Sequence, residues 1–250
     1  RPLPETALTT YACLIEAFAY WRDYQPFQHA RARDCLERVL QGDPNFALGY
    51  ATLAPLYLDE YRNGFNPRPG DAPPLDRALR AARRAVELKP GSARAYQALL
   101  DTQFVRRDFK LALEAGEKAV MLNPYDPDIL ADFGARLVAL GEVARGADLL
   151  DEASKLIIVR PAWHDFYLFL SAYLQGDLGD AARYASLITS ETFPLGLVAR
   201  ALTAAGRGDE ELVKRTIDRL VLLAPGWREN PRRELEKFFP APAIVERLAR

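Results

Sequence analysis

The sequence has few of the residues from which metal sites and catalytic centres are built. Its 250 residues include two cysteines, two histidines and one methionine. Cys13 and Cys35 lack the CxxC spacing of zinc sites and lie among apolar residues of a helical pattern. We therefore expect two buried, unreactive thiols, with a disulfide between them as the alternative. His29 and His164 have no cysteine, histidine or carboxylate at metal-ligand spacing, which favours two surface histidines.

Catalytic motifs are missing as well. The chain contains no GxSxG, no phosphate-binding loop and no dinucleotide fingerprint. Adjacent acids such as Asp59 and Glu60 point about 100° apart on a helix, so they do not share a site. We expect a protein that is not an enzyme and that needs no metal or cofactor.

The chain has neither an excess of one charge nor a long apolar run. Its 33 Lys and Arg residues balance 34 Asp and Glu residues, so no nucleic acid and no anionic membrane is predicted as a partner. The local exception, six arginines against two aspartates from Arg62 to Arg84, is typical of a solvated helix face. No run approaches the ~18 apolar residues that a membrane span requires.

The sequence also lacks an initial methionine and a leader of charged and then apolar residues. We expect a fragment of a longer polypeptide. The expected compartment is the cytoplasm, with the periplasm as the alternative if the upstream part carries a signal or a membrane anchor.

The chain does contain a repeated six-residue segment. AVELKP at 85–90 returns 34 residues later as AVMLNP at 119–124. With the final proline as a marker, Pro44, Pro90, Pro124 and Pro225 take the same place, and 12 extra residues at 62–73 explain the longer first interval. A period of this size is typical of stacked structural repeats.

Each repeat has the pattern of two helices. Segments such as 46–61 and 93–105 place apolar residues at i, i+3, i+4 and i+7, as an amphipathic helix requires. The second helix carries small residues seven positions apart, which lie on one face and allow a neighbouring helix to approach closely. These pairs are Ala78 and Ala85, Ala112 and Ala119, and Gly146 and Ala153. The proline then ends the helix.

This pattern resembles tetratricopeptide repeats, which have an aromatic residue near position 4, small residues at positions 20 and 27, and proline at 32. The matching residues are Tyr50, Tyr96, Ala78, Ala112, Ala85, Ala119, Pro90 and Pro124. Leu100 at position 8 and Gln103 at position 11 depart from this consensus pattern. In the last two repeats the positions of the pattern are shifted by one to three residues. The resemblance implies an all-α, right-handed superhelical array of about six helix-turn-helix repeats. We place them in a single domain at 10–45, 46–91 with the insertion 62–73, 92–125, 126–159, 160–193 and 194–226, followed by a C-terminal capping helix at 229–250.

A narrower resemblance covers most of the chain. The segments TTYACLIEAFAYWRDYQPFQHARARDCLERVL, LYLDEYRNGFNPRPGD and PRRELEKFF are similar to the C-terminal repeat regions of certain bacterial signalling proteins. In those proteins the repeats follow a class III adenylate or guanylate cyclase domain or another module, often with a segment like the TolB amino-terminal domain. The resemblance implies a non-catalytic sensory or scaffolding module beside a catalytic domain outside these residues.

Tetratricopeptide arrays bind peptides or helices on the concave face lined by their first helices. In the third repeat the residues on that face are predicted to be Arg94, Gln97, Asp101 and Phe104. In the fifth repeat they are Trp163, Phe166, Leu170 and Tyr173, an apolar stripe too large to leave in water. The predicted function is therefore protein–protein interaction, and an architectural spacer or oligomerisation domain is the alternative.

Three candidates can cover the apolar stripe. They are the chain itself, through its C-terminal segment at 230–250 or through tight closure of the superhelix, a second copy of the chain, or a partner helix or peptide. Because a terminal repeat needs a cap, we expect Leu235 and Phe238 to be structural. The insertion 62–73 is either a tolerated loop or a binding finger that exposes Phe65.

Overall fold

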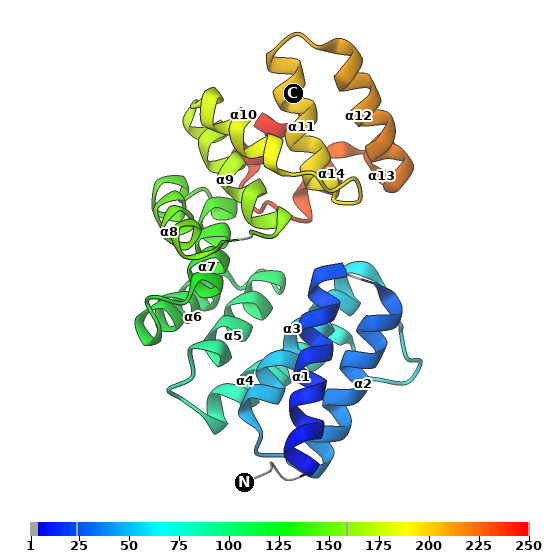
Figure 1. Cartoon of the computed structure of the whole chain (residues 1–250), viewed down its shortest axis with the longest axis vertical. Coiled ribbons are helices and arrows are strands. Elements are labelled where there is room, and N and C mark those ends of the chain that lie inside the picture. The colour runs from blue at the N-terminus through cyan, green and yellow to red at the C-terminus, as the bar shows by residue number, and fades with distance from the viewer. Residues whose placement is uncertain (1–4, 24, 159, 250) are drawn as a thin grey trace. The chain divides into compact units, whose positions relative to one another are not determined.

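The computed structural model describes residues 5–23, 25–158 and 160–249, and from Thr10 onward their side chains also, except at positions 22 and 23. These residues form fifteen helices and no strand (Figure 1). The predicted all-α array of helical hairpins is confirmed. The chain divides into two compact units, unit 1 from Arg1 to Pro124 and unit 2 from Tyr125 to Arg250.

Unit 1 consists of three hairpins whose paired helices pack against each other. They are α1 (Glu5–Asp23) with α2 (Pro26–Gly42), α3 (Ala47–Asn63) with α4 (Pro74–Leu88), and α5 (Ala93–Val105) with α6 (Phe109–Leu122). The first helices also contact each other in order, because α3 packs against both α1 and α5. Each hairpin therefore buries its apolar face against its neighbour, as in stacked repeats.

Unit 2 has three further hairpins and a C-terminal segment. The hairpins are α7 (Pro127–Leu140) with α8 (Val143–Leu156), α9 (Ala162–Gln175) with α10 (Leu178–Leu187), and α11 (Pro194–Gly206) with α12 (Glu210–Leu223). The segment that follows is made of α13 (Gly226–Glu229), α14 (Pro231–Glu236) and α15 (Pro242–Leu248). Short helices thus take the place of the single capping helix predicted at 229–250.

The recurring prolines end the second helices as predicted. Helices α2, α4, α6 and α12 all stop two residues before the marker proline. The residue between takes nearly the same extended conformation each time, with φ from −147 to −130° and ψ from 79 to 90°. Proline disfavours the helical conformation in the residue before it, and the same residue type marks the helix end in four repeats.

The small residues of the second helices are buried, and at one crossing they are indispensable. Gly146 of α8 faces Gly134 of α7, and a Cβ on Gly146 would lie 2.6 Å from the Gly134 carbonyl oxygen. It would also lie 2.9 Å from the Val138 nitrogen. The two backbones are so close that only glycine fits, since neither contact atom belongs to a side chain that can rotate away.

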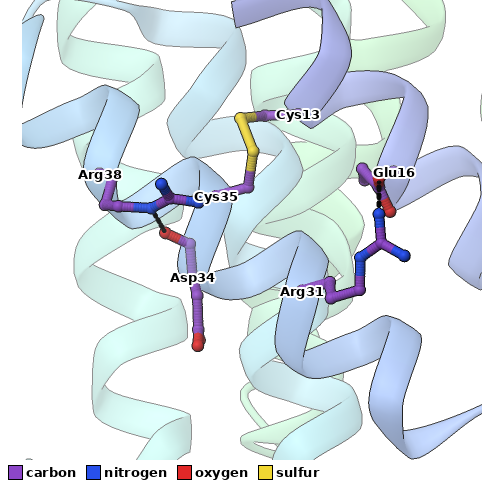
Figure 2. The surroundings of a disulfide bond; sticks show 6 residues. All are labelled: Cys13, Glu16, Arg31, Asp34, Cys35 and Arg38. Carbon is purple, nitrogen blue, oxygen red and sulfur yellow. Dashed lines mark hydrogen bonds and ion pairs between the residues drawn. A yellow bond between two sulfur atoms is a disulfide. The ribbon is translucent and has the colours of Figure 1, made fainter. Parts of the chain in front are cut away.

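The expectation of two free thiols is wrong. Cys13 and Cys35 form a disulfide between α1 and α2, with their Cα atoms 5.4 Å apart (Figure 2). Arg31 and Glu16 form an ion pair between the same two helices. The two cysteines are 22 positions apart, and only the antiparallel packing of the first hairpin brings them within the reach of a disulfide.

The prediction of surface histidines is also wrong, because both imidazoles are fully buried. His29 Nε2 lies 2.9 Å from the carbonyl oxygen of Leu56, and His164 Nε2 lies 3.3 Å from that of Leu150. Each imidazole therefore donates a hydrogen bond to a backbone carbonyl of another helix. Burial lowers the pKa of both histidines, and the bond to the carbonyl opposes this shift only in part, so the neutral imidazole is favoured.

We predict that Gly146→Ala destabilises unit 2 by about 1–3 kcal/mol, because the added methyl group forces α7 and α8 apart. Urea unfolding of the full chain measures the change. Gly206→Ala is the matched control, since a Cβ on this last residue of α11 has no atom within 4 Å. The control should be neutral or stabilising, and an equal loss in both variants would contradict the close crossing.

Candidate functional site

The predicted binding residues of α5 form a partly exposed polar face. Arg94, Gln97 and Asp101 are half-buried, and Arg94 Nη1 donates a hydrogen bond of 2.8 Å to Gln97 Oε1. Phe104 differs from them, because it is buried and packs against Phe109 of α6 with ring centroids 5.6 Å apart. Phe104 is thus a core residue of its own hairpin, and the surface of α5 is polar.

The predicted apolar stripe of α9 is largely covered. Phe166 and Leu170 are fully buried, whereas Trp163 and Tyr173 keep part of their surface. These two flank the stripe, with Trp163 stacked on His164 and Tyr173 stacked on Phe169. The sequence placed Phe166 and Leu170 on a partner-binding face, but in the structure they belong to the core, because helix periodicity does not reveal what covers a face.

The chain itself covers part of the stripe, which is the first of the three alternatives left open by the sequence: its C-terminal segment contacts Phe166 and Tyr173, and Phe193 also packs on Phe166, with ring centroids 6.1 Å apart. Phe239 is 1% exposed and lies 6.1 Å from Phe166, centroid to centroid. Arg247 of α15 lies over the Tyr173 ring and donates hydrogen bonds to the carbonyls of Leu174 and Tyr173, at 3.1 and 2.8 Å. The segment that follows α12 therefore covers part of the apolar face of α9.

Of the two residues of this segment that were predicted to be structural, one is not buried. Leu235 is buried, as expected, but Phe238 is 37% exposed. Phe239 takes the buried position instead. Both phenylalanines follow the end of α14 at Glu236, so helix periodicity no longer determines which ring points inward.

The insertion after α3 is attached to α2 and is not a free finger. Residues 62 and 63 extend α3, and the loop proper starts at Gly64. Phe65 is half-buried, with its ring 5.8 Å from His29, which corrects the exposed Phe65 of the finger hypothesis. The Asn66 amide lies 2.7 Å from the Pro26 carbonyl and 3.1 Å from His29 Nδ1. The insertion thus seals one end of the first hairpin.

Charged residues connect the insertion to the interior of unit 1. Arg33 and Glu60 form a buried ion pair at 2.9 Å, and Arg33 also donates to the Asn66 carbonyl at 2.8 Å. Arg77 of α4 pairs with the same Glu60. Paired charges of this kind tolerate burial only because each finds its partner. Part of the arginine-rich stretch 62–84 is therefore structural, although the sequence predicted a solvated face.

A hollow of about 520 Å³ opens between α3 and α4. Its lining is aromatic and apolar on one side and rich in arginine on the other. The lining residues are Tyr50, Leu53, Tyr57, Arg77, Arg80, Ala81, Arg83, Arg84 and Glu87.

Tyr57 and Arg77 form a fixed end of this hollow. The Arg77 guanidinium lies 4.5 Å from the centre of the Tyr57 ring, and the Tyr57 hydroxyl donates to Glu37 Oε1 at 2.7 Å. Burial, followed by the bond to Glu37, raises the pKa of Tyr57. The hydroxyl therefore stays protonated at neutral pH and keeps donating this bond.

The described residues offer no group of three or more His, Cys, Asp or Glu side chains that could hold a metal ion. Within the same residues no helix is long and apolar enough to cross a membrane. The surface of unit 1 has a polar helix face on α5 and an arginine-rich hollow beside α4.

Comparison with known proteins gives one distant sequence relative. No protein-family model matches the sequence. The cellulose synthase operon protein C of Pseudomonas fluorescens is 30% identical over 156 residues, which are 61% of this chain and 11% of that protein. The chain thus matches a small part of a much longer relative.

Solved structures give a clearer answer for the fold. PilF of Pseudomonas aeruginosa is 16% identical with a TM-score of 0.62, over 93% of this chain and 100% of PilF. PilW, a type IV pilus biogenesis factor, is 19% identical with a TM-score of 0.60, over 90% and 96% of the two chains. YrrB, described as a tetratricopeptide protein with an unusual peptide-binding site, is 20% identical with a TM-score of 0.50, over 76% and 92%.

The chain has the tetratricopeptide-repeat fold. In this fold the glycine pair of α7 and α8 occupies positions 8 and 20 of the fourth repeat, counted with Ile158 at position 32. The sequence analysis does not predict a role for Gly134. Its place twelve residues before Gly146, at a position where the repeat has a small residue, is the sequence feature that indicates the close crossing.

We predict that Phe239→Ala lowers the stability of unit 2 by about 3–5 kcal/mol, because it empties the space against Phe166 and Tyr167. The neighbouring Phe238→Ala is the control and should cost less than about 1 kcal/mol, since its ring is partly exposed. Thermal unfolding followed by circular dichroism measures both. Similar losses in the two variants would show that the C-terminal segment does not pack in this way.

Proposed function

We propose that the chain is a non-catalytic protein-interaction module that binds a peptide or a helix through the polar face of α5. The observation that supports this most directly is the half-exposed set Arg94, Gln97 and Asp101 on a first helix that packs beside α3. First helices line the binding face of tetratricopeptide arrays. YrrB, with the same fold, is described as having a peptide-binding site.

The wider context is proposed from the resemblance to bacterial signalling proteins. In that setting the repeats would position or regulate an effector domain outside these 250 residues, such as a nucleotide cyclase. The long relative in Pseudomonas fluorescens, of which the match covers 11%, is also much larger than this chain. A repeat module joined to other domains is therefore a reasonable arrangement.

For the compartment we propose the periplasm, which was the alternative to the cytoplasm. The Cys13–Cys35 disulfide supports it, because disulfides persist in oxidising compartments and are rare in the reducing cytoplasm.

Affinity capture from the protein's own cells, fractionated into periplasm and cytoplasm, tests function and compartment together. The triple variant Arg94→Ala, Gln97→Ala, Asp101→Ala keeps a strong helix former at each site. We expect it to weaken the capture of a specific partner at least about tenfold, as the loss of central contacts does. We also expect the chain and its partner in the periplasmic fraction.

The control for capture has the same spacing on α12. This control variant changes an exposed face of unit 2 and should retain the partner; its substitutions are Glu211→Ala, Lys214→Ala and Asp218→Ala. Capture that is equal in all three proteins would contradict binding through α5. A chain found in the cytoplasmic fraction would contradict the proposed compartment alone.

Self-association, the second candidate, is favoured by one face of α1. Tyr11, Ile15 and Phe18 are 58–65% exposed and follow helical spacing, so they form an apolar stripe. A second copy could bury the same stripe in a two-fold contact. Sedimentation velocity at several concentrations should then show a dimer that Ile15→Asp dissociates. A wild-type chain that remains monomeric at all concentrations excludes this function.

A further inference from the structure

The hollow of unit 1 is formed by two rows of side chains. Tyr50, Leu53 and Tyr57 lie three and four positions apart on α3, so they share one face of that helix. On α4, Arg77, Arg80 and Arg84 follow the same spacing. One wall is therefore aromatic and apolar, and the other is cationic.

The charges on the cationic wall are unequally compensated. Arg77 is held by Glu60 and lies 3.4 Å from Asp71, and Arg84 is 3.4 Å from Glu87. Arg80 and Arg83 are exposed, and no carboxylate of the described residues lies within ion-pair distance of either. The hollow thus presents two cationic groups whose charge no neighbour neutralises.

Both helices contribute to an apolar floor of the hollow, Leu53 from α3 and Ala81 from α4. Leu53 is 4% exposed and Ala81 is 5% exposed, so both lie at the bottom and not at the rim. Arg77 closes one end in a fixed position, because it stacks on Tyr57 and pairs with Glu60. A ligand that fits this site combines an apolar group with carboxylates at the rim, since planar guanidinium groups bind carboxylates well.

We propose that this hollow binds an acidic segment of a partner protein, with its carboxylates on Arg80 and Arg83 and an apolar side chain against Leu53 and Ala81. The proposal rests on the proposed function, protein binding, and names the chemistry of the partner at a surface distinct from α5. A nucleic acid is disfavoured, because it is held through many phosphate contacts and the hollow has two uncompensated arginines.

Fluorescence anisotropy with the full chain tests the proposal. The probe is a fluorescein-labelled peptide of about ten residues in which glutamate and leucine alternate, and its matched partner has glutamine in place of glutamate. We expect the glutamate peptide to bind and the glutamine peptide to bind much more weakly. The affinity for the glutamate peptide should fall with rising salt concentration.

The double variant Arg80→Glu, Arg83→Glu should bind the glutamate peptide about tenfold more weakly, as expected for the loss of two surface ion pairs. Lys214→Glu, Arg215→Glu on α12 changes the net charge equally and should bind like the wild type. Both pairs are exposed, and circular dichroism confirms that the variants remain folded.

Three results would overturn the proposal. They are no binding of the glutamate peptide, an equal loss in the two double variants, and stronger binding of an oligouridylate that displaces the peptide. If the peptide fails to bind while the capture experiment still yields a partner that depends on α5, protein binding stands and the acidic-segment site is wrong. If both experiments fail, the proposed function fails with it.

Discussion

The structure depends on the close approach of helices within and between hairpins. A single hairpin has an apolar face that it cannot bury alone, so stability arises only where neighbouring hairpins stack. Small residues on the second helices make that stacking close. Gly134 and Gly146 are the extreme case, with backbones in direct contact. The recurring proline ends four of the second helices at the same point of the repeat.

A stack of hairpins leaves an apolar face at its end. Different contacts stabilise the terminal hairpins of unit 1 and of unit 2. In unit 2 the C-terminal segment packs Phe239 against Phe166 and covers part of the face of α9. In unit 1 the first hairpin is linked by the Cys13–Cys35 disulfide, and the insertion after α3 packs on α2. The insertion looks like a spacer in the sequence, yet it supplies contacts to a buried histidine and a buried arginine.

Charge has two distinct uses in unit 1. Arg33, Glu60 and Arg77 form a buried group in which each charge has a partner, and this group connects α2, α3 and α4. Beyond it on α4, Arg80 and Arg83 are exposed and uncompensated. The same arginine-rich stretch thus contributes to the core at one end and provides a cationic surface at the other.

Sequence patterns alone predict the all-α class, the 34-residue period, the helix ends before the prolines and the small residues of the second helices. The helix pattern, the helix ends and the small residues depend on neighbours a few positions apart, and the 34-residue period is the repetition of this local pattern along the chain. The packing of the folded chain determines that the cysteines are bonded, that both histidines are buried, and that Phe239 and not Phe238 faces the core. It also determines that Phe166 and Leu170 are covered. These outcomes depend on segments far apart in the chain, and a periodic pattern shows which face is apolar but not what lies against it.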